Sequence, residues 1–245
     1  MKSRPSPNHD ARPEGGRIDT LVLHYTGMKS ADEALERLCD PAAKVSAHYL
    51  IEEDGAVWSL VPEDRRAWHA GVASWRGATD INARSIGIEL ANPGHEFGYR
   101  AFPAAQIGAL RALARDVRKR HAIPPDNVVG HSDVAPLRKQ DPGELFDWRA
   151  LAAEGIGLWP AEQSTRPGAW IMEFGDKNEA VADMQRRFAA YGYGVPSTGV
   201  FDDTTFATVK AFQRHFRPRL VDGLADAETQ GRLDDLLTQV GRRLG

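Results

Sequence analysis

The stretch from residue 130 to residue 143 limits the fold of this chain more than any other. It follows a short apolar run at Val128 and Val129, and it is closed by Pro142 and Gly143. This pattern predicts a strand that runs into a long, ordered loop. The loop carries one histidine, two aspartates, an arginine and a lysine. Such a loop adds little to stability, but it is a favourable place for functional side chains.

The chain around this loop alternates between predicted strands and helices. Apolar and β-branched runs predict strands over residues 18–24, 46–51, 56–61, 84–90 and 127–129. Asp54 and Gly55 predict a hairpin turn between the second and the third of these strands. Apolar residues at helical spacing predict helices over residues 30–40, with Ser30 as the N-cap, and over residues 103–121. These elements favour an α/β domain.

A second, smaller domain is expected after a change in composition between residues 155 and 168, where glycine, proline and serine are frequent. Three helical patterns follow, roughly at residues 178–191, 202–216 and 225–237. The first residues are rich in proline, serine and arginine, which favours a loosely ordered segment. We therefore expect a flexible segment at 1–16, an α/β domain at 17–160, a linker at 161–176 and an all-α three-helix domain at 177–240.

The composition narrows the classes of function. With 42% hydrophobic and 27% charged residues, the chain is typical of a soluble globular protein. A net charge of -3 does not favour nucleic-acid binding, and no apolar run approaches the ~20 residues that span a bilayer. Cys39 is the only cysteine, which excludes an intrachain disulfide and a cysteine-based metal cluster. Because the N-terminus has no apolar secretory signal, we expect a cytoplasmic protein, and a monomer, with a periplasmic or wall-associated location as the alternative.

Three side chains form a candidate metal site. His24 ends the first predicted strand, and His131 and Asp141 lie in the loop at 130–143. Two neutral imidazoles and one carboxylate, with a fourth position for water, are a known ligand set for catalytic zinc, which lowers the pKa of bound water towards ~7. Glu89, at the polar end of an apolar strand, suits the general base. Lys139 suits the stabilisation of an oxyanion.

Each of these residues also has a structural interpretation. A histidine at a strand end is more often hydrogen-bonded in a core than bound to a metal, and an aspartate before Pro-Gly is an ordinary turn residue. Asp133 competes with Asp141 for the role of ligand. Residues 131–133 also fit the His-x-Asp part of a non-haem iron triad, for which the remaining histidine would be His215 in the second domain.

The order of three motifs resembles that of a known enzyme family. Residues 21–26 (LVLHYT), 85–89 (SIGIE) and 130–143 (GHSDVAPLRKQDPG) are similar to motifs of the zinc-dependent N-acetylmuramoyl-L-alanine amidases, which are related to phage lysozyme-type amidases and to peptidoglycan recognition proteins. The resemblance extends from about residue 18 to residue 159. It implies an α/β fold with a mixed central β-sheet flanked by helices.

The resemblance also implies a role for each candidate residue. By position, His24, His131 and Asp141 hold one zinc ion per chain, Glu89 is the catalytic glutamate, and Lys139 stabilises the transition state. The implied reaction is hydrolysis of the amide between N-acetylmuramic acid, or its anhydro form, and L-alanine of the stem peptide.

Two further segments, 46–49 and 80–84, resemble segments that line the substrate groove of the family. They make His48, Tyr49, Asn82 and Arg84 candidate substrate contacts. Leu137 departs from the family pattern, in which a small residue is frequent, and this difference bears on the shape of the loop near the substrate.

The second domain resembles the small three-helix peptidoglycan-binding domain over about residues 177–237. The similar segments are 181–188, 198–205 and 209–214, and they imply that peptidoglycan or muropeptide fragments are the partners. Such a domain would raise the local concentration of the amidase at the wall polymer. Phe188, Phe206 and Phe212 keep helical spacing, which favours a place in the core of the domain over a place in a binding surface.

Two questions stay open at this point. The missing signal favours soluble anhydro-muropeptides as substrate, whereas the second domain favours the intact wall. A non-catalytic peptidoglycan recognition protein on the same fold is the alternative function. The presence of all three ligand positions and of Glu89 argues against that alternative.

Overall fold

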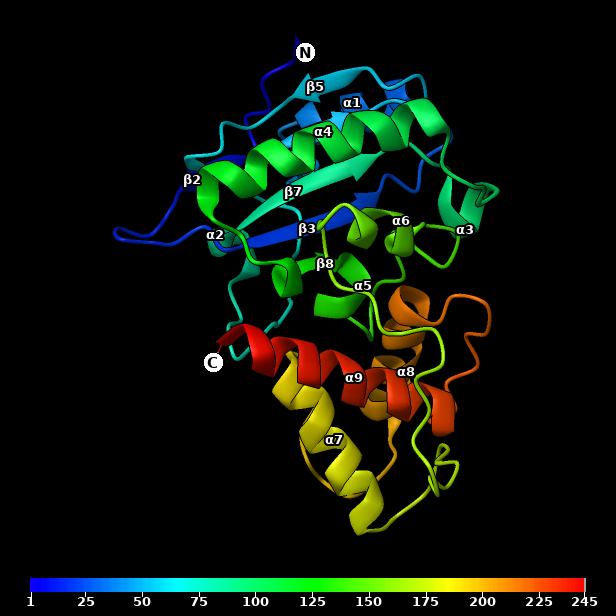
Figure 1. Ribbon diagram of the computed structural model, residues 1–245. Coiled ribbons are helices and arrows are strands. Elements are labelled where there is room, and N and C mark those ends of the chain that lie inside the picture. Colours follow the sequence, from blue (N-terminus) through cyan, green and yellow to red (C-terminus); the bar gives the residue numbers. More distant parts are fainter. Residues whose placement is uncertain (245) are drawn as a thin grey trace.

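The computed structural model describes residues 1–244 and has two parts, which Figure 1 shows one above the other. The upper part contains a β-sheet flanked by helices. The lower part contains helices α7 (Glu179–Tyr191), α8 (Asp203–Phe216) and α9 (Ala227–Leu244). The predicted fold class, an α/β domain followed by a small helical domain, is confirmed.

The central sheet has its strands in the order β1-β5-β4-β7-β3-β8. Their bounds are Lys2–Ser3 (β1), Thr20–Tyr25 (β3), Tyr49–Ile51 (β4), Val57–Ser59 (β5), Ser85–Leu90 (β7) and Val128–Gly130 (β8). Strands β4, β7, β3 and β8 run parallel, whereas β5 runs antiparallel to β4 across the hairpin predicted at Asp54 and Gly55. The sheet is therefore mixed, as predicted.

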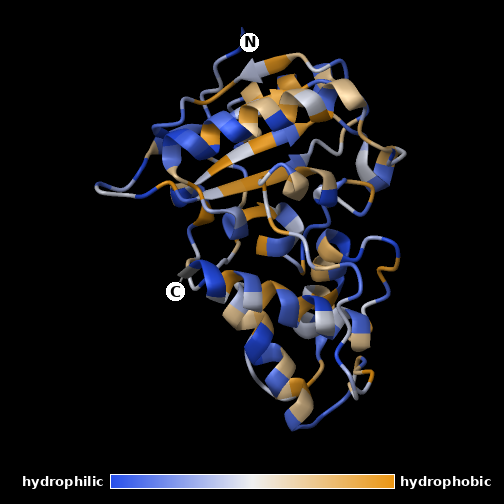
Figure 2. Ribbon diagram, viewed as in Figure 1, coloured by the Kyte–Doolittle hydropathy of each residue, from blue (hydrophilic) through white to orange (hydrophobic). Residues whose placement is uncertain are grey.

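The register between β3 and β7 places His24 directly opposite Glu89. Partner residues in neighbouring strands point to the same face of a sheet, and successive residues point to opposite faces. Leu21 and Leu23 therefore point away from His24, and they pack with Leu110 of α4 (Ala104–His121). Figure 2 shows β3 and β7 mostly in the hydrophobic colour, as expected for strands buried on both faces.

Two helices of the upper part were predicted with nearly correct bounds. Helix α4 extends across the sheet in Figure 1 and buries its apolar stripe there. Helix α1 (Ala31–Cys39) begins at the predicted N-cap Ser30, whose hydroxyl oxygen accepts the N–H of Glu33 at 3.1 Å. The remaining helices are short: Ile81–Arg84 (α2), Gly94–Phe97 (α3), Pro125–Asn127 (η1), His131–Val134 (α5) and Trp148–Ala153 (α6). The stretch predicted as a loop at 130–143 thus contains helix α5.

The first residues of the chain belong to the folded structure, so the prediction of a flexible segment at 1–16 is wrong for much of its length. Strand β1 pairs with β5, and β2 (His9–Ala11) pairs with β6 (Arg65–Ala67). The Asn8 amide donates to the carbonyls of Asp40 and Val45, both at 2.8 Å. The composition of residues 1–16 did not indicate that this segment is folded, because the segment is held by hydrogen bonds to residues that are distant in the sequence.

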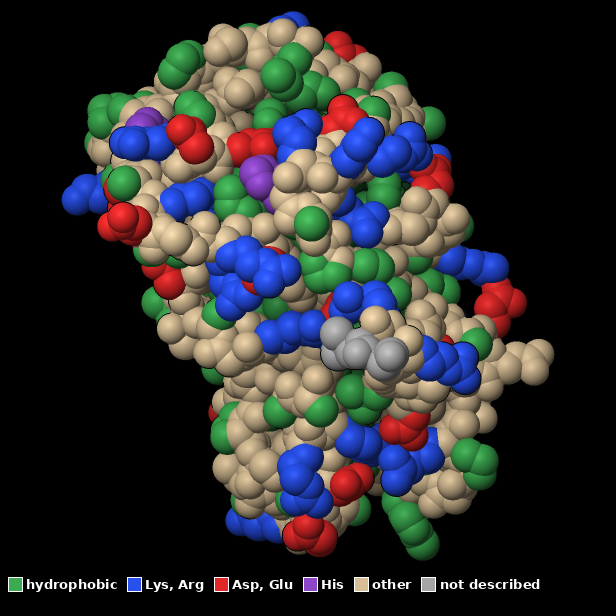
Figure 3. Space-filling model, turned by 60° about the vertical axis from the view of Figure 1, so that its left-hand side comes forward, with side chains coloured by type: hydrophobic (Ala, Val, Ile, Leu, Met, Phe, Trp, Pro, Cys, Tyr) green, Lys and Arg blue, Asp and Glu red, His purple; other side chains and the backbone are tan. Residues whose placement is uncertain are grey.

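The lower part packs directly against the upper part. One hydrophobic cluster joins Val129 and Val134 of the upper part to Phe188 and Phe212 of the lower part. On the face drawn in Figure 3, Lys and Arg side chains gather where the two parts meet. Arg243 of α9 forms an ion pair with the buried Asp126 of the upper part. Helix α9 continues to Leu244, beyond the predicted end at residue 237. Among the described helices, none has the length and apolar character that a membrane crossing requires.

Candidate active site

Three side chains that are far apart in the sequence converge on one point. His24 Nδ1 and His131 Nδ1 are 3.0 Å apart, and each is 3.1 Å from Asp141 Oδ2. All three residues are buried. The structure thus brings together the predicted metal ligands, and it selects Asp141 rather than Asp133 as their carboxylate partner.

Neighbouring parallel strands explain why these residues meet. His24 lies near the carboxyl end of β3, and His131 follows directly on β8, the parallel neighbour of β3. The carboxyl ends of parallel strands meet at one edge of a sheet, where ligand sites are common. Asp141 is held beside them because the N–H of Ser132 donates to the Asp141 carbonyl at 2.9 Å.

Hydrogen bonds around His24 decide which of its nitrogens faces this cluster. The Ser85 hydroxyl donates to the Ile81 carbonyl at 2.6 Å, so its oxygen accepts the N–H of His69 Nε2 at 3.0 Å. His69 Nδ1 is then the acceptor for the N–H of His24 Nε2, also at 3.0 Å. His24 Nδ1 therefore carries a lone pair, as a metal ligand must.

The donor set fits a zinc ion. His131 Nε2 donates to the Ala70 carbonyl at 3.1 Å, which leaves His131 Nδ1 free to bind a metal. Atoms that bind zinc tetrahedrally, at about 2.0–2.2 Å, stand roughly 3.3–3.6 Å from one another. The 3.0–3.1 Å separations of the three ligand atoms are close to this spacing.

The protonation states of the cluster also suit metal binding. Burial and the neighbouring His131 lower the pKa of His24 to about 4. Burial alone would raise the pKa of Asp141, but the imidazoles of His131 and His24 outweigh it and hold that pKa well below its ordinary value. At neutral pH the site therefore offers a neutral His24 and an ionised Asp141, the forms that bind a metal.

Glu89 faces the cluster from β7. Its Oε2 atom is buried and has no hydrogen-bond partner among the described residues. Burial, followed by the charge of Asp141, raises the pKa of Glu89 well above its ordinary value, and Lys139 acts in the opposite direction. A carboxylate with a free oxygen and a raised pKa is suited to taking and giving a proton near neutral pH.

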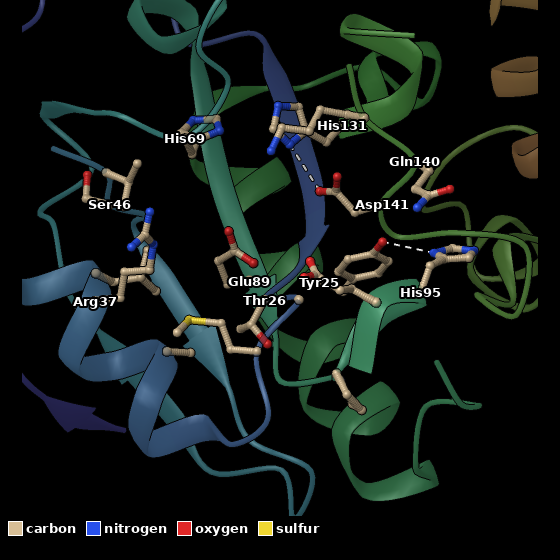
Figure 4. A pocket seen from close by; sticks show the side chains of 18 of the residues that line it. Tyr25, Thr26, Arg37, Ser46, His69, Glu89, His95, His131, Gln140 and Asp141 are labelled. Atoms are coloured by element: carbon tan, nitrogen blue, oxygen red, sulfur yellow. Dashed lines mark hydrogen bonds and ion pairs between the residues drawn. The ribbon is translucent and has the colours of Figure 1, made fainter. Parts of the chain in front are cut away.

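These residues open into a pocket of about 420 Å³, which lies in the usual range for small-molecule sites. In Figure 4, Glu89 lies between two walls, with Arg37 and Ser46 on one side and Tyr25 and His95 on the other. Lys139 is exposed and also lines this pocket. The structure therefore gathers all of the predicted metal and catalytic residues at one site: His24, Glu89, His131, Lys139 and Asp141.

Two predicted substrate contacts, His48 and Tyr49, do not line the pocket. His48 is fully buried, and its Nδ1 atom accepts the N–H of Gly87 at 2.9 Å. The Tyr49 hydroxyl donates to the Glu63 carboxylate at 2.7 Å. Because both side chains are engaged inside the fold, the prediction that they touch a substrate is wrong.

The other two predicted contacts, Asn82 and Arg84, also lie outside the pocket. Asn82 Oδ1 accepts the N–H groups of His69 and Ala70, at 3.1 and 2.8 Å, and so orients the segment that holds both ligand histidines. Arg84 Nε donates to Asp19 at 2.8 Å. The resemblance thus pointed to residues that are bonded within the fold and lie outside this pocket.

Asp133, the other aspartate of the loop, orders the loop and does not contact a ligand imidazole. Its carboxylate bonds instead to the N–H of Gly130 and to Tyr193 and His215 of the lower part, each at 2.7 Å. His215 therefore reaches Asp133 but does not complete an iron triad, because the metal-binding atom of His131 faces His24 and Asp141 instead.

The sequence did not identify several residues of the pocket. His69 lines the pocket and also bonds to His24. A Cβ atom at Gly87 would lie 2.5 Å from the His69 ring, so this close approach requires glycine. Arg37 and His95 gave no signal, since neither lies in a motif. Tyr25 offered only its position next to His24 at a strand end.

Comparisons with known proteins agree with this geometry. The profile of the N-acetylmuramoyl-L-alanine amidase family matches residues 14–144, which is more than half of the chain, and the profile of a peptidoglycan binding domain matches residues 177–233. The chain is 42% identical over 239 residues to the N-acetylmuramoyl-L-alanine amidase AmiD of Escherichia coli (strain K12), covering 92% of this chain and 84% of AmiD. It is 37% identical over 161 residues to the 1,6-anhydro-N-acetylmuramyl-L-alanine amidase AmpD of the same strain, covering 59% of this chain and 86% of AmpD.

Solved structures extend the similarity to both parts of the chain. The complex of AmiD from E. coli with the substrate anhydro-N-acetylmuramic acid-L-Ala-D-gamma-Glu-L-Lys has a TM-score of 0.80 at 41% identity, and covers 94% of this chain and 91% of AmiD. AmpDh3 from Pseudomonas aeruginosa, in complex with anhydromuramic pentapeptide, has a TM-score of 0.81 at 35% identity, and covers 91% of this chain and 92% of AmpDh3.

Proposed function

The chain belongs to the N-acetylmuramoyl-L-alanine amidase family, and on that premise we propose that it is a zinc-dependent hydrolase of muropeptides. The bond cleaved is the amide between N-acetylmuramic acid, or its anhydro form, and L-alanine of the stem peptide. The observation that carries the proposal is the triangle of His24, His131 and Asp141 beside the unpartnered carboxylate of Glu89.

His24 Nδ1, His131 Nδ1 and Asp141 Oδ2 are the atoms that would hold one zinc ion. A zinc ion at this site supplies Lewis-acid chemistry, because it polarises the amide carbonyl and makes water more acidic. The protein residues around the three ligands fix them before any ion binds. His69 holds His24, and the Ala70 carbonyl holds His131.

Glu89 is the proposed general base and acid. It takes a proton from the attacking water and then gives that proton to the nitrogen of the leaving L-alanine. The free Oε2 atom supports this role, because it is available to water, and so does the raised pKa, because it lets the carboxyl hold the proton between the two steps.

Lys139 is the proposed oxyanion partner. Lys139 lines the same pocket as Glu89 and Asp141. A cation at this position stabilises the negative charge that develops on the carbonyl oxygen during attack, and a partly enclosed pocket strengthens that interaction relative to water.

Arg37 gives the opposite wall of the pocket a positive charge. It is exposed, and its guanidinium makes no ion pair among the described residues. The other arginine of the pocket, Arg138, already donates to the carbonyls of Ala70 and Val72. A γ-linked D-glutamate, as in the substrate bound to AmiD, keeps a free α-carboxylate. We place this carboxylate at Arg37.

The test is to incubate the purified, zinc-loaded protein with anhydro-N-acetylmuramic acid-L-Ala-D-γ-Glu-L-Lys and, separately, with intact cell-wall sacculi. We expect release of the stem tripeptide, which chromatography and mass spectrometry would detect and quantify. Binding without release would instead identify a peptidoglycan recognition protein. The ratio of the two rates decides between soluble and polymeric substrate, and fractionation of cells tests the cytoplasmic location that we expect.

A further inference from the structure

The proposed chemistry does not use Asp133, although this residue lies between two of the ligands in the sequence. Its side chain is 1% exposed. Oδ2 accepts the N–H of Gly130 and the N–H of His215 Nδ1, and Oδ1 accepts the hydroxyl of Tyr193, each at 2.7 Å. A buried carboxylate is costly unless donors surround it, and here two of the three donors come from the helical domain.

Asp133 is directly connected to the ligand loop. It is the third residue of α5, the helix that begins with His131, and its bond to the N–H of Gly130 caps that helix. The next residue along from His131, Ser132, donates its N–H to the carbonyl of Asp141. One short helix therefore positions two metal ligands, and the Asp133 carboxylate fixes where that helix begins.

The helical domain holds this carboxylate through a close-fitting contact. The His215 ring stacks on Trp148 of α6 at 3.7 Å between centroids, and the Tyr193 ring packs edge-on against Trp75 at 5.2 Å. A Cβ atom at Gly192 would lie 2.8 Å from the Trp75 ring, so the two parts approach as closely as glycine allows. Further along the loop, Arg214 of α8 reaches Gln140, the residue before Asp141.

From these contacts we propose that the helical domain positions the metal loop, with Tyr193 and His215 acting through Asp133. This inference rests on the zinc site proposed above. This positioning role of the helical domain differs from that of a domain that only brings the enzyme to the wall. Tyr193 and His215 are positioning residues, because they lie behind the loop and do not line the pocket.

The experiment measures zinc affinity by competition with a chromophoric chelator, in full-length protein whose fold is checked by circular dichroism. Tyr193→Phe removes one hydroxyl and keeps the ring. We expect about a tenfold loss of zinc affinity, the lower end of what second-layer changes cost in metal sites. Tyr191→Phe is the matched control, because its hydroxyl makes no hydrogen bond among the described residues, and its affinity should equal that of the wild type.

A second pair of variants tests His215. His215→Leu removes the donor to Asp133 and should also weaken zinc binding, whereas His215→Asn keeps an N–H near the position of Nδ1 and should restore most of the affinity. If His215→Leu fails to fold, the comparison of Tyr193→Phe with Tyr191→Phe still decides the matter. Wild-type zinc affinity in folded Tyr193→Phe would overturn the inference. Zinc binding without release of stem peptide by the wild type would instead overturn the proposed function and leave this comparison intact.

Discussion

Glu89 illustrates how the neighbours of a single residue set its chemistry. A glutamate at the end of a strand is an ordinary surface residue in most sheets. Here the register of β7 against β3 places it opposite His24, burial raises its pKa, and one oxygen is left without a partner. These three conditions turn an acid into a candidate proton carrier.

The first prediction separates proton transfer from metal binding. Glu89→Gln preserves size and removes the titrating oxygen, so we expect kcat to fall by about 10²–10⁴ while zinc content stays near one per chain. His131→Ala should instead lose zinc. Rates of stem-peptide release and metal analysis by mass spectrometry measure the two effects. Full activity in zinc-loaded Glu89→Gln would contradict the mechanism.

The second prediction concerns Arg37. If its guanidinium pairs with the α-carboxylate of the γ-linked glutamate, Arg37→Met should raise KM about tenfold, as expected for losing a charged hydrogen bond, and leave kcat nearly unchanged. A substrate with an amidated α-carboxyl serves as the internal reference, since its KM should not respond. Lys29→Met, which removes a positive charge outside the pocket lining, is the control variant. Equal changes in KM for both substrates would place the carboxylate elsewhere.

At the scale of the elements, the parallel arrangement of β7, β3 and β8 determines where the site lies. These strands end at one edge of the sheet, so Glu89, His24 and His131 meet there although they are far apart in the chain. The opposite face of the same strands packs against α4 and supplies stability. Chemistry and packing are thus divided between the two faces of the sheet by the alternation of side chains.

The third prediction concerns Glu63, which ties β4 to the end of α4. It accepts hydrogen bonds from Tyr49, Arg120 and His121. Burial alone would raise the pKa of Glu63, but hydrogen bonds from Arg120, His121 and Tyr49 outweigh it and lower that pKa from 4.5 to about 2. A lowered pKa contributes stability above the unfolded value and loses it as pH falls from about 4.5 towards 2.

Glu63→Gln should therefore destabilise the protein by about 1–2 kcal/mol at pH 7. The difference between wild type and variant should shrink as pH falls below about 4.5, because Glu63 of the unfolded chain then takes up a proton while Glu63 of the folded protein, with a pKa of about 2, stays ionised. Urea unfolding at pH 7, 5 and 3.5 measures this difference. A difference that stays constant across these pH values would exclude the charge of Glu63 as the cause.

At the scale of the whole molecule, the two parts share a hydrophobic cluster and a buried polar contact, so the second domain is more than an attached module. The linker at 161–176 was predicted from composition, which does not detect an interface between two domains.

The fourth prediction concerns removal of the metal. A ligand at 100 times its Kd stabilises the folded state by about 2.7 kcal/mol, which corresponds to roughly 5–10 °C in Tm for a chain of this size. Treatment with a strong chelator should lower Tm by about this amount, and added zinc should restore it, as followed by scanning calorimetry. Asp141→Asn should show no such response. An unchanged wild-type Tm after removal of the metal would argue against the three-ligand site.

The sequence by itself determined the chemistry of the site. Residue types and strand ends indicated the candidates, and the resemblance of three motifs to the amidase family implied the role of each. The structure brings these candidates together: His24, Glu89, His131, Lys139 and Asp141. Such prediction works because a catalytic role requires particular kinds of side chain. It also works because strand ends and loops can be predicted from short stretches of sequence. The helices α1 and α4 were predictable for the same reason, since caps and apolar stripes are local signals.

Only the tertiary structure decided which residues surround that chemistry. The pairing of the first residues with β5 and β6, the chain of hydrogen bonds from His24 through His69 to Ser85, and the engagement of Asp133 by Tyr193 and His215 all join segments distant in the sequence. The same holds for His48, Tyr49, Asn82 and Arg84, whose partners lie within the fold and not in the pocket. Contacts of this kind depend on how the whole chain arranges its helices and strands in space, and a local sequence pattern does not predict that arrangement.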